Sequence, residues 1–127
     1  YLIGSKSDDE LCNKIAENCV KRTSVNLSGK LSLLQTAALM KDALMNFTND
    51  SAPQHLASAM NAPVATIFCS TVPSFGFGPL SEVSFVIETA QPLPCRPCGL
   101  HGYRVCPEKH FNCALTINNE QLLSCLI

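Results

Sequence analysis

Charged residues and long apolar runs are both scarce in this sequence. Only 15% of its 127 residues are charged and the formal net charge is −1, so no general electrostatic attraction to nucleic acid or to an anionic membrane is expected. No apolar stretch approaches the length that spans a bilayer, and no signal peptide opens the sequence. A G-x-G-x-x-G fingerprint is missing too, which argues against a standard dinucleotide site.

The residues that are present predict a well-packed globular chain. Apolar residues make up 46% of the sequence, and its length suits a single domain over residues 1–127. The chain opens with the apolar triplet Tyr1-Leu2-Ile3, which is typical of the interior of a fold. We therefore expect a domain that was excised from a longer protein.

Helical and extended patterns alternate along the chain. The expected helices cover residues 8–20, 32–41, 53–60 and 118–127, and the expected strands cover residues 2–3, 23–27, 43–48, 64–68 and 85–88. The buried side of the first helix is expected at Leu11, Ile15, Cys19 and Val20, and that of the second at Leu33, Leu34, Ala37, Ala38 and Met40. This alternation predicts an α/β fold, with a Rossmann-like parallel sheet that carries helices on both faces.

One stretch, residues 46–68, has the features of an anion site. It predicts a strand, a polar turn, a helix that opens at Pro53 and a second buried strand. Asp50 or Ser51 can cap that helix, and His55 lies within its first turns. The unpaired amides and the dipole at such a helix start attract anions at the carboxyl ends of strands. A purely structural cap is the alternative, because capping Asp-Ser pairs are common.

The same stretch resembles a known family. The sequence D-S-A-P-Q-H at residues 50–55 is similar to the D-[ST]-[GA]-x-x-H signature of the ADP-heptose:lipopolysaccharide heptosyltransferases, glycosyltransferase family 9. The sequence V-A-T-I-F at residues 64–68, followed by S-T-V-P at 70–73 and G-P at 78–79, resembles the segment that comes next in that family. The resemblance implies the C-terminal, nucleotide-sugar-binding lobe of a two-lobed GT-B glycosyltransferase.

The resemblance also implies a set of residues that bind the ADP-sugar donor. The segment with Asp50, Ser51, Ala52 and His55 would hold the diphosphate, where family members often have Gly at the position of Ala52. Asp8 would accept hydrogen bonds from the ribose hydroxyl groups, although charge compensation of the helix dipole is the favoured explanation for the acidic residues 8–10 when they are taken alone. Leu31 would lie in the loop that contacts the adenine. No cofactor is expected to be required, and a divalent ion at Asp50 is left open.

Function follows from the same resemblance. It implies transfer of heptose to the lipopolysaccharide inner core, in the cytoplasm at the inner face of the inner membrane, with peripheral membrane association. The catalytic base and the acceptor site would lie in an N-terminal lobe that this segment lacks, so no catalytic residue is expected here and the segment alone is expected to be inactive. The alternatives are a non-catalytic nucleotide- or phosphate-binding module and a structural zinc-loop interaction domain.

Four of the eight cysteines fall in one segment that is rich in Pro and Gly. Cys95, Cys98, Cys106 and Cys113, with His101 and His110 among them, are compatible with a tetrahedral zinc site. Free thiols explain them equally well, and disulfides less well. A redox role is disfavoured because a thioredoxin-type C-x-x-C follows a strand and opens a helix. The clustering and the α/β pattern together favour a reducing cytoplasm.

Overall fold

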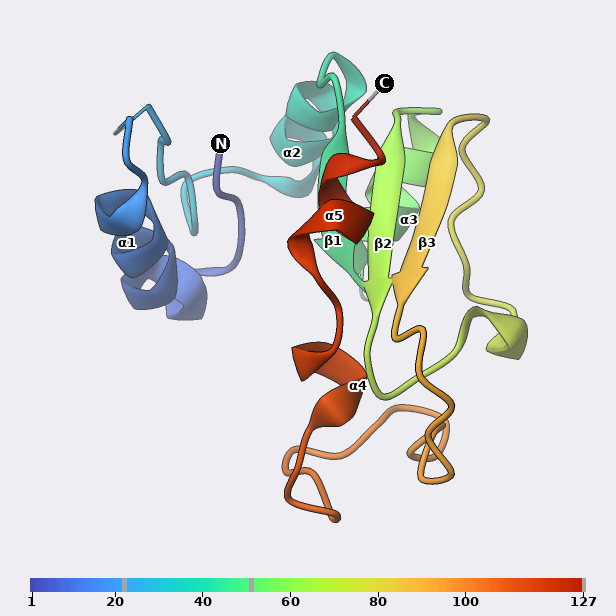
Figure 1. The fold of residues 1–127 in the computed structure, drawn as a ribbon. Helices are drawn as coiled ribbons and strands as arrows, with labels where there is room; N and C mark the ends of the chain where they lie inside the picture. Colours follow the sequence, from blue (N-terminus) through green and yellow to red (C-terminus); the bar gives the residue numbers. More distant parts are fainter. Residues whose placement is uncertain (22, 51, 127) are drawn as a thin grey trace. The chain divides into compact units, whose positions relative to one another are not determined.

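The structure, a computed structural model, describes residues 1–21, 23–50 and 52–126 (Figure 1). Arg22, Ser51 and Ile127 lie outside the described residues. The chain divides into two compact units, Tyr1–Ala38 and Leu39–Ile127, each of which is described by itself.

The first unit is built around one helix and one backbone bridge. A short 3-10 helix, η1 (Lys6–Asp8), leads into α1 (Asp9–Asn18). Leu2 pairs with Asn26 in an isolated parallel bridge, which is all that forms of the strand expected over residues 23–27. The Asn26 side-chain amide donates to the Asp9 carboxylate at 2.9 Å and to the Asn13 amide oxygen at 2.8 Å. A polar side chain thus connects the bridge to α1, where the pattern predicted a short strand.

The apolar positions expected to be buried in the first two helices are largely exposed. Leu11 and Ile15 on α1 are exposed, and Val20 lies beyond the helix end and is 99% exposed. Cys12 is instead the buried residue of α1. In α2 (Leu33–Lys41), Ala37 and Met40 are buried as expected but Leu33 and Leu34 are exposed. Helical spacing alone does not show which apolar face has a packing partner, and the predictions for the exposed positions were wrong for that reason.

The second unit contains a three-stranded parallel sheet in the order β1-β2-β3. Its strands are β1 (Asn46–Asn49), β2 (Val64–Phe68) and β3 (Ser84–Glu88). The expected bounds of the central strand are confirmed, whereas the first strand begins at Asn46 and not at residue 43, where the chain still turns out of α2. All strands therefore end at the same edge of the sheet.

Helices cover both faces of this sheet, as the α/β prediction requires. In Figure 1, α3 (Ala52–Ala59) lies behind the strands and α5 (Asn119–Leu123) lies in front of them. Successive side chains of β2 alternate between these faces. Ala65 packs with Ile87 and Cys125 on the α5 side, while Phe68 lies on the α3 side. Because both faces are covered, β2 is almost continuously buried.

Local sequence signals fix the ends of these helices. α3 closes with Asn61 in the left-handed region at φ 49°, and the amide of Ala62 donates to the carbonyl of Ala57 at 2.9 Å, as in a Schellman motif. At the start of α5, the Asn118 side chain accepts from the backbone amide of Gln121 at 3.0 Å. The Gln121 side chain in turn accepts from the backbone amide of Asn118 at 3.0 Å. The expected cap at Asn118 is confirmed.

Irregular segments connect the rest of the second unit. The chain from β2 to β3 contains a short 3-10 helix, η2 (Pro73–Phe75), and the long loop after β3 leads into α4 (Asn112–Leu115). Among the described residues, no helix has both the length and the apolar character that crossing a bilayer demands.

We predict that Gly29→Ala is more damaging than Gly76→Ala. Both glycines have a positive φ, 67° and 92°, which costs an alanine about 1–2 kcal/mol. At Gly29 an added Cβ would also lie 2.9 Å from the Cα of Lys6, whereas at Gly76 it meets nothing within 4 Å. Native-state hydrogen exchange at the amides that flank each turn measures the difference. Equal losses of protection would show that the Gly29 contact is not a constraint.

Candidate active site

The carboxyl ends of the three strands bring polar residues to one edge of the sheet. Asp50 follows β1, the segment from Cys69 to Thr71 follows β2, and Glu88 ends β3. The amide of Asp50 donates to the carbonyl of Ile67 at 3.0 Å, so the first two strand ends are joined beyond the regular ladder. This edge is where open parallel sheets bind their ligands.

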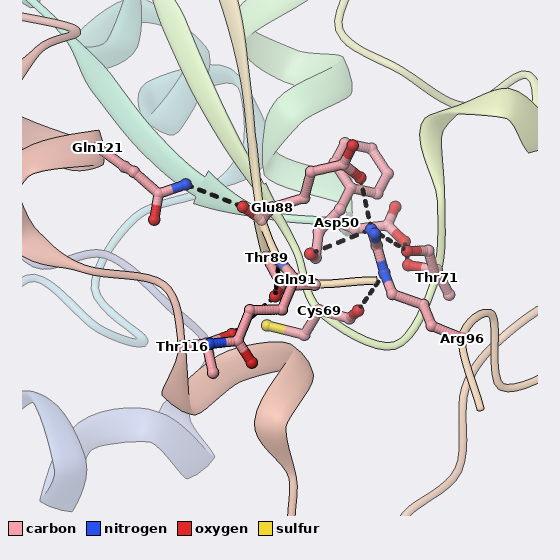
Figure 2. A network of polar contacts seen from close by, with 10 residues as sticks. Asp50, Cys69, Thr71, Glu88, Thr89, Gln91, Arg96, Thr116 and Gln121 are labelled. Carbon is pink, nitrogen blue, oxygen red and sulfur yellow. Dashed lines mark hydrogen bonds and ion pairs between the residues drawn. The ribbon is translucent and has the colours of Figure 1, made fainter. Parts of the chain in front are cut away.

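Arg96, from the long loop after β3, forms hydrogen bonds to the residues that follow β2 and to the last residue of β3 (Figure 2). Its Nε donates to the carbonyl of Cys69 at 2.8 Å, and its Nη2 donates to the carbonyl of Thr71 at 2.8 Å and to the Glu88 carboxylate at 2.6 Å. The Arg96 side chain is only 12% exposed. A planar guanidinium can serve several acceptors in fixed directions at once, which an ammonium group cannot do. Arg96 therefore sets the path of the chain as it leaves β2.

That path places Thr71 against Asp50. The Thr71 hydroxyl donates to one oxygen of the Asp50 carboxylate, and the Gln54 side-chain amide donates to the other at 3.3 Å. Gln54 is fully buried and also donates to the carbonyl of Phe77 at 2.8 Å. Two neighbouring side chains thus orient the carboxylate, and each of its oxygens keeps a lone pair for a further donor.

A cavity of about 590 Å³ opens beside this carboxylate. The polar residues of its wall are Asp50, Thr71, His55 on α3 and His101 from the loop after β3. The remaining wall is apolar and consists mainly of Phe68, Val72, Phe75, Phe77 and Leu100. A few convergent polar groups on an apolar wall are the usual make-up of a small-molecule site.

The structure brings together the residues that the sequence predicted in the second unit. Asp50, Ala52 and His55 all line the cavity, and α3 begins at Ala52 with its amino end there. Ser51 lies outside the described residues. Asp8 and Leu31 belong to the first unit, so their expected roles toward the ribose and the adenine stay predictions.

Asp8 has a defined local environment in the first unit. Its carboxylate accepts from the Ser5 hydroxyl at 2.6 Å and from the Ser5 amide at 2.7 Å. The hydroxyl bond, followed by the backbone bond, lowers the pKa of Asp8, because both stabilise the charged form. An added Cβ at Gly4 would lie 2.9 Å from this carboxylate, so Gly4 leaves room for the turn. The turn leaves Asp8 exposed, with one carboxylate oxygen free of these two bonds.

Sequence reasoning missed four residues of this edge: Gln54, Thr71, Arg96 and His101. Gln54 lies inside the recognised 50–55 segment but was not assigned a role, although a buried glutamine needs polar partners. Thr71 also fell in a recognised segment. Arg96 and His101 come from the cysteine-rich loop, and no local pattern shows that this loop returns to the end of β2.

The four clustered cysteines lie around a second cavity. Cys95, Cys98, Cys106 and Cys113 line a space of about 310 Å³ together with His110. All are free thiols in the described structure. Burial, and then the charge of the neighbouring Cys95 and Cys106, raises the pKa of Cys98. Among the described residues, no three His, Cys, Asp or Glu side chains converge closely enough to hold a metal ion, so the zinc interpretation stays a prediction.

The architecture and the cavity define an α/β domain with a ligand site at the carboxyl edge of its sheet. The sequence profile described as glycosyltransferase family 9 (heptosyltransferase) matches residues 1–103. The chain therefore belongs to glycosyltransferase family 9.

Individual relatives support this membership. Lipopolysaccharide heptosyltransferase 3 of Escherichia coli (strain K12) is 32% identical over 96 residues, which cover 73% of this chain and 28% of that protein. Lipooligosaccharide heptosyltransferase 2 of Haemophilus influenzae is 30% identical over 90 residues, covering 68% and 26%. The solved structure of E. coli ADP-heptose lps heptosyltransferase II matches with a TM-score of 0.66 and 26% identity over 98% of this chain and 35% of that one. The chain thus spans about a quarter to a third of these relatives.

We predict that Arg96→Lys destabilises the second unit by about 2 kcal/mol, because a lysine leaves one or two of the buried carbonyl acceptors without a donor. Arg104→Lys is the matched control, since Arg104 is exposed in the same loop, and its effect should stay within about 0.5 kcal/mol. Urea unfolding followed by circular dichroism measures both. Similar midpoints for the two variants would show that Arg96 does not hold the strand ends.

Proposed function

We propose that this chain is the donor-binding part of a heptosyltransferase and holds an ADP-activated heptose at the carboxyl edge of its sheet. The observation that carries the proposal is the cavity in which Asp50, His55 and the amino end of α3 meet. The likeness to the structure of E. coli ADP-heptose lps heptosyltransferase II supports the choice of donor.

The groups around the cavity suit the two halves of such a donor differently. The first amides of α3 and the imidazole of His55 are donors, so they suit the diphosphate and the charge that grows on the leaving ADP. The Asp50 carboxylate repels phosphate and suits hydroxyl donors of the sugar instead. Because Thr71 and Gln54 already hold it in place, little ordering is needed when the sugar arrives.

The transfer step needs groups of a second kind. A general base must remove a proton from the acceptor hydroxyl while the nucleoside diphosphate leaves. We propose that this chain supplies stabilisation of the leaving group, and that the acceptor, a lipopolysaccharide core, is bound by the further length that family members possess. On this proposal the enzyme works in the cytoplasm at the inner face of the inner membrane, where it touches the membrane peripherally. Asp8 and Leu31 would complete the nucleotide contacts.

We predict that His55→Ala weakens binding of both ADP and ADP-heptose, and that Asp50→Asn weakens ADP-heptose more than ADP. The loss of a charged hydrogen bond, about 1.5–3 kcal/mol, corresponds to a roughly 10- to 100-fold higher Kd. Isothermal titration calorimetry on the chain measures these constants. Asp42→Asn changes the same charge at an exposed position of the same unit and should leave both constants unchanged.

Two results would contradict this assignment. Equal effects of Asp50→Asn and Asp42→Asn would remove Asp50 from the site. If the chain binds ADP-heptose but transfers no heptose when it is joined to the remainder of a family 9 enzyme, it is a nucleotide-binding module and not part of a transferase.

A further inference from the structure

The loop after β3 contains four cysteines with the spacing Cys-x2-Cys-x7-Cys-x6-Cys over residues 95–113. They line one cavity of about 310 Å³, although they are separated by up to eighteen positions in the chain. None of the residues that bind the donor in the proposal above lines this space. The cavity therefore needs an explanation of its own.

The backbone around the cavity turns tightly next to the cysteines. In the first turn, which contains Cys95, the amide of Arg96 donates to the carbonyl of Leu93 at 3.0 Å, and Cys98 is followed by Gly99 in the left-handed region at φ 70°. In the second turn, the amide of Lys109 donates to the carbonyl of Cys106 at 3.1 Å. A pair of short turns that present thiols to one space is the usual frame of a structural zinc site, in which ligand pairs are spaced closely along the chain.

His110 lines the same cavity, but its hydrogen bonds assign it a different role. Its Nδ1 accepts from the amide of Asn112 at 3.0 Å, so the neutral ring carries its proton on Nε2. That Nε2 lies 3.9 Å from the Sγ of Cys95 and points its N–H at the sulfur. A protonated Nε2 cannot bind a metal, and a hydrogen bond to a thiolate is what the outer partner of a metal ligand provides.

We propose that Cys95, Cys98, Cys106 and Cys113 bind one Zn²⁺ ion as a four-thiolate structural site, with His110 as a hydrogen-bonding partner of Cys95. In the described structure the Cys98 thiol donates to the carbonyl of Cys95 at 3.3 Å, and the four sulfurs do not yet converge. Zinc binding turns them toward the common cavity and releases the thiol protons.

A zinc ion here would stiffen the loop that forms part of the donor cavity. Arg96 lies between the first two ligands and holds the end of β2, and the amide of Cys98 donates to the carbonyl of Ser70 at 2.8 Å. Leu100 and His101, which line the larger cavity, come two and three residues after Cys98. The metal therefore acts by positioning this loop and not by chemistry on a substrate.

Metal content and coordination of the chain, purified under reducing conditions, test the proposal. We expect about one zinc per chain by mass spectrometry, and X-ray absorption should show four sulfur neighbours at about 2.3 Å. Cobalt substituted for zinc should give the visible d–d bands of a tetrahedral site and thiolate-to-metal charge transfer. A metal-free chain with no cobalt spectrum would overturn the proposal, as would disulfide bonds among these four cysteines in protein purified without a reductant.

Variants separate the ligands from their neighbours. Cys106→Ser should lower the zinc content well below one per chain, while Cys19→Ser, which lies outside the loop, should leave it unchanged. His110→Gln should keep the zinc with roughly tenfold lower affinity. Three sulfur neighbours and one nitrogen in the unsubstituted protein, with zinc lost in His110→Gln, would overturn the four-thiolate assignment. If Cys106→Ser fails to fold, the absorption and cobalt data on the unsubstituted chain still decide. None of these readouts involves a nucleotide, so they stand apart from the donor proposal.

Discussion

The guanidinium of Arg96 is the constraint on which the sheet edge depends. Parallel strands leave their last carbonyl groups without ladder partners, and a chain that turns away from the sheet needs donors for them. Arg96 supplies these donors to the carbonyls of Cys69 and Thr71 and also pairs with Glu88 at the end of β3. One buried side chain from a distant loop thus holds the chain where it leaves β2 and the last residue of β3. Because Thr71 donates to the Asp50 carboxylate, Arg96 also orients that carboxylate indirectly.

Hydrogen-bond donors and a hydrogen-bond acceptor occupy different parts of the cavity wall. The amino end of α3 and the two imidazoles offer hydrogen-bond donors, while the oriented carboxylate of Asp50 offers an acceptor. A diphosphate and a sugar carry the complementary groups, since one is an acceptor and the other is rich in hydroxyl donors. The proposed donor therefore fits the chemistry of the edge as well as the membership of the chain in glycosyltransferase family 9.

Sequence reasoning succeeded where the signals were local. The continuous β-branched and apolar character of residues 64–68 predicted β2, and Asn118 predicted the start of α5. Both predictions succeeded because strand burial and helix capping depend on residues that are adjacent in the sequence. The pattern of residues 50–55 likewise predicted that Asp50 and His55 share a site, and the cavity contains both.

Features that arise from distant contacts could not be predicted. Nothing near Arg96 in the sequence shows that its side chain reaches the end of β2, and nothing near His101 shows that it faces the same cavity as His55. The exposure of Leu33 and Leu34 could not be predicted for the same reason, because helical spacing identifies an apolar face but not the element that packs against it. The bridge at Asn26 replaced a strand because its side chain bonds to α1, a contact with no local signature.

Nuclear magnetic resonance of the isotope-labelled chain, titrated with ADP, shows whether the nucleotide binds at the carboxyl edge of the sheet. We expect the largest amide shifts at the start of α3, at Thr71 and at His101, which surround one cavity although they are far apart in sequence. Shifts confined to α5 and the opposite face of the sheet, or none at millimolar ADP, would contradict it.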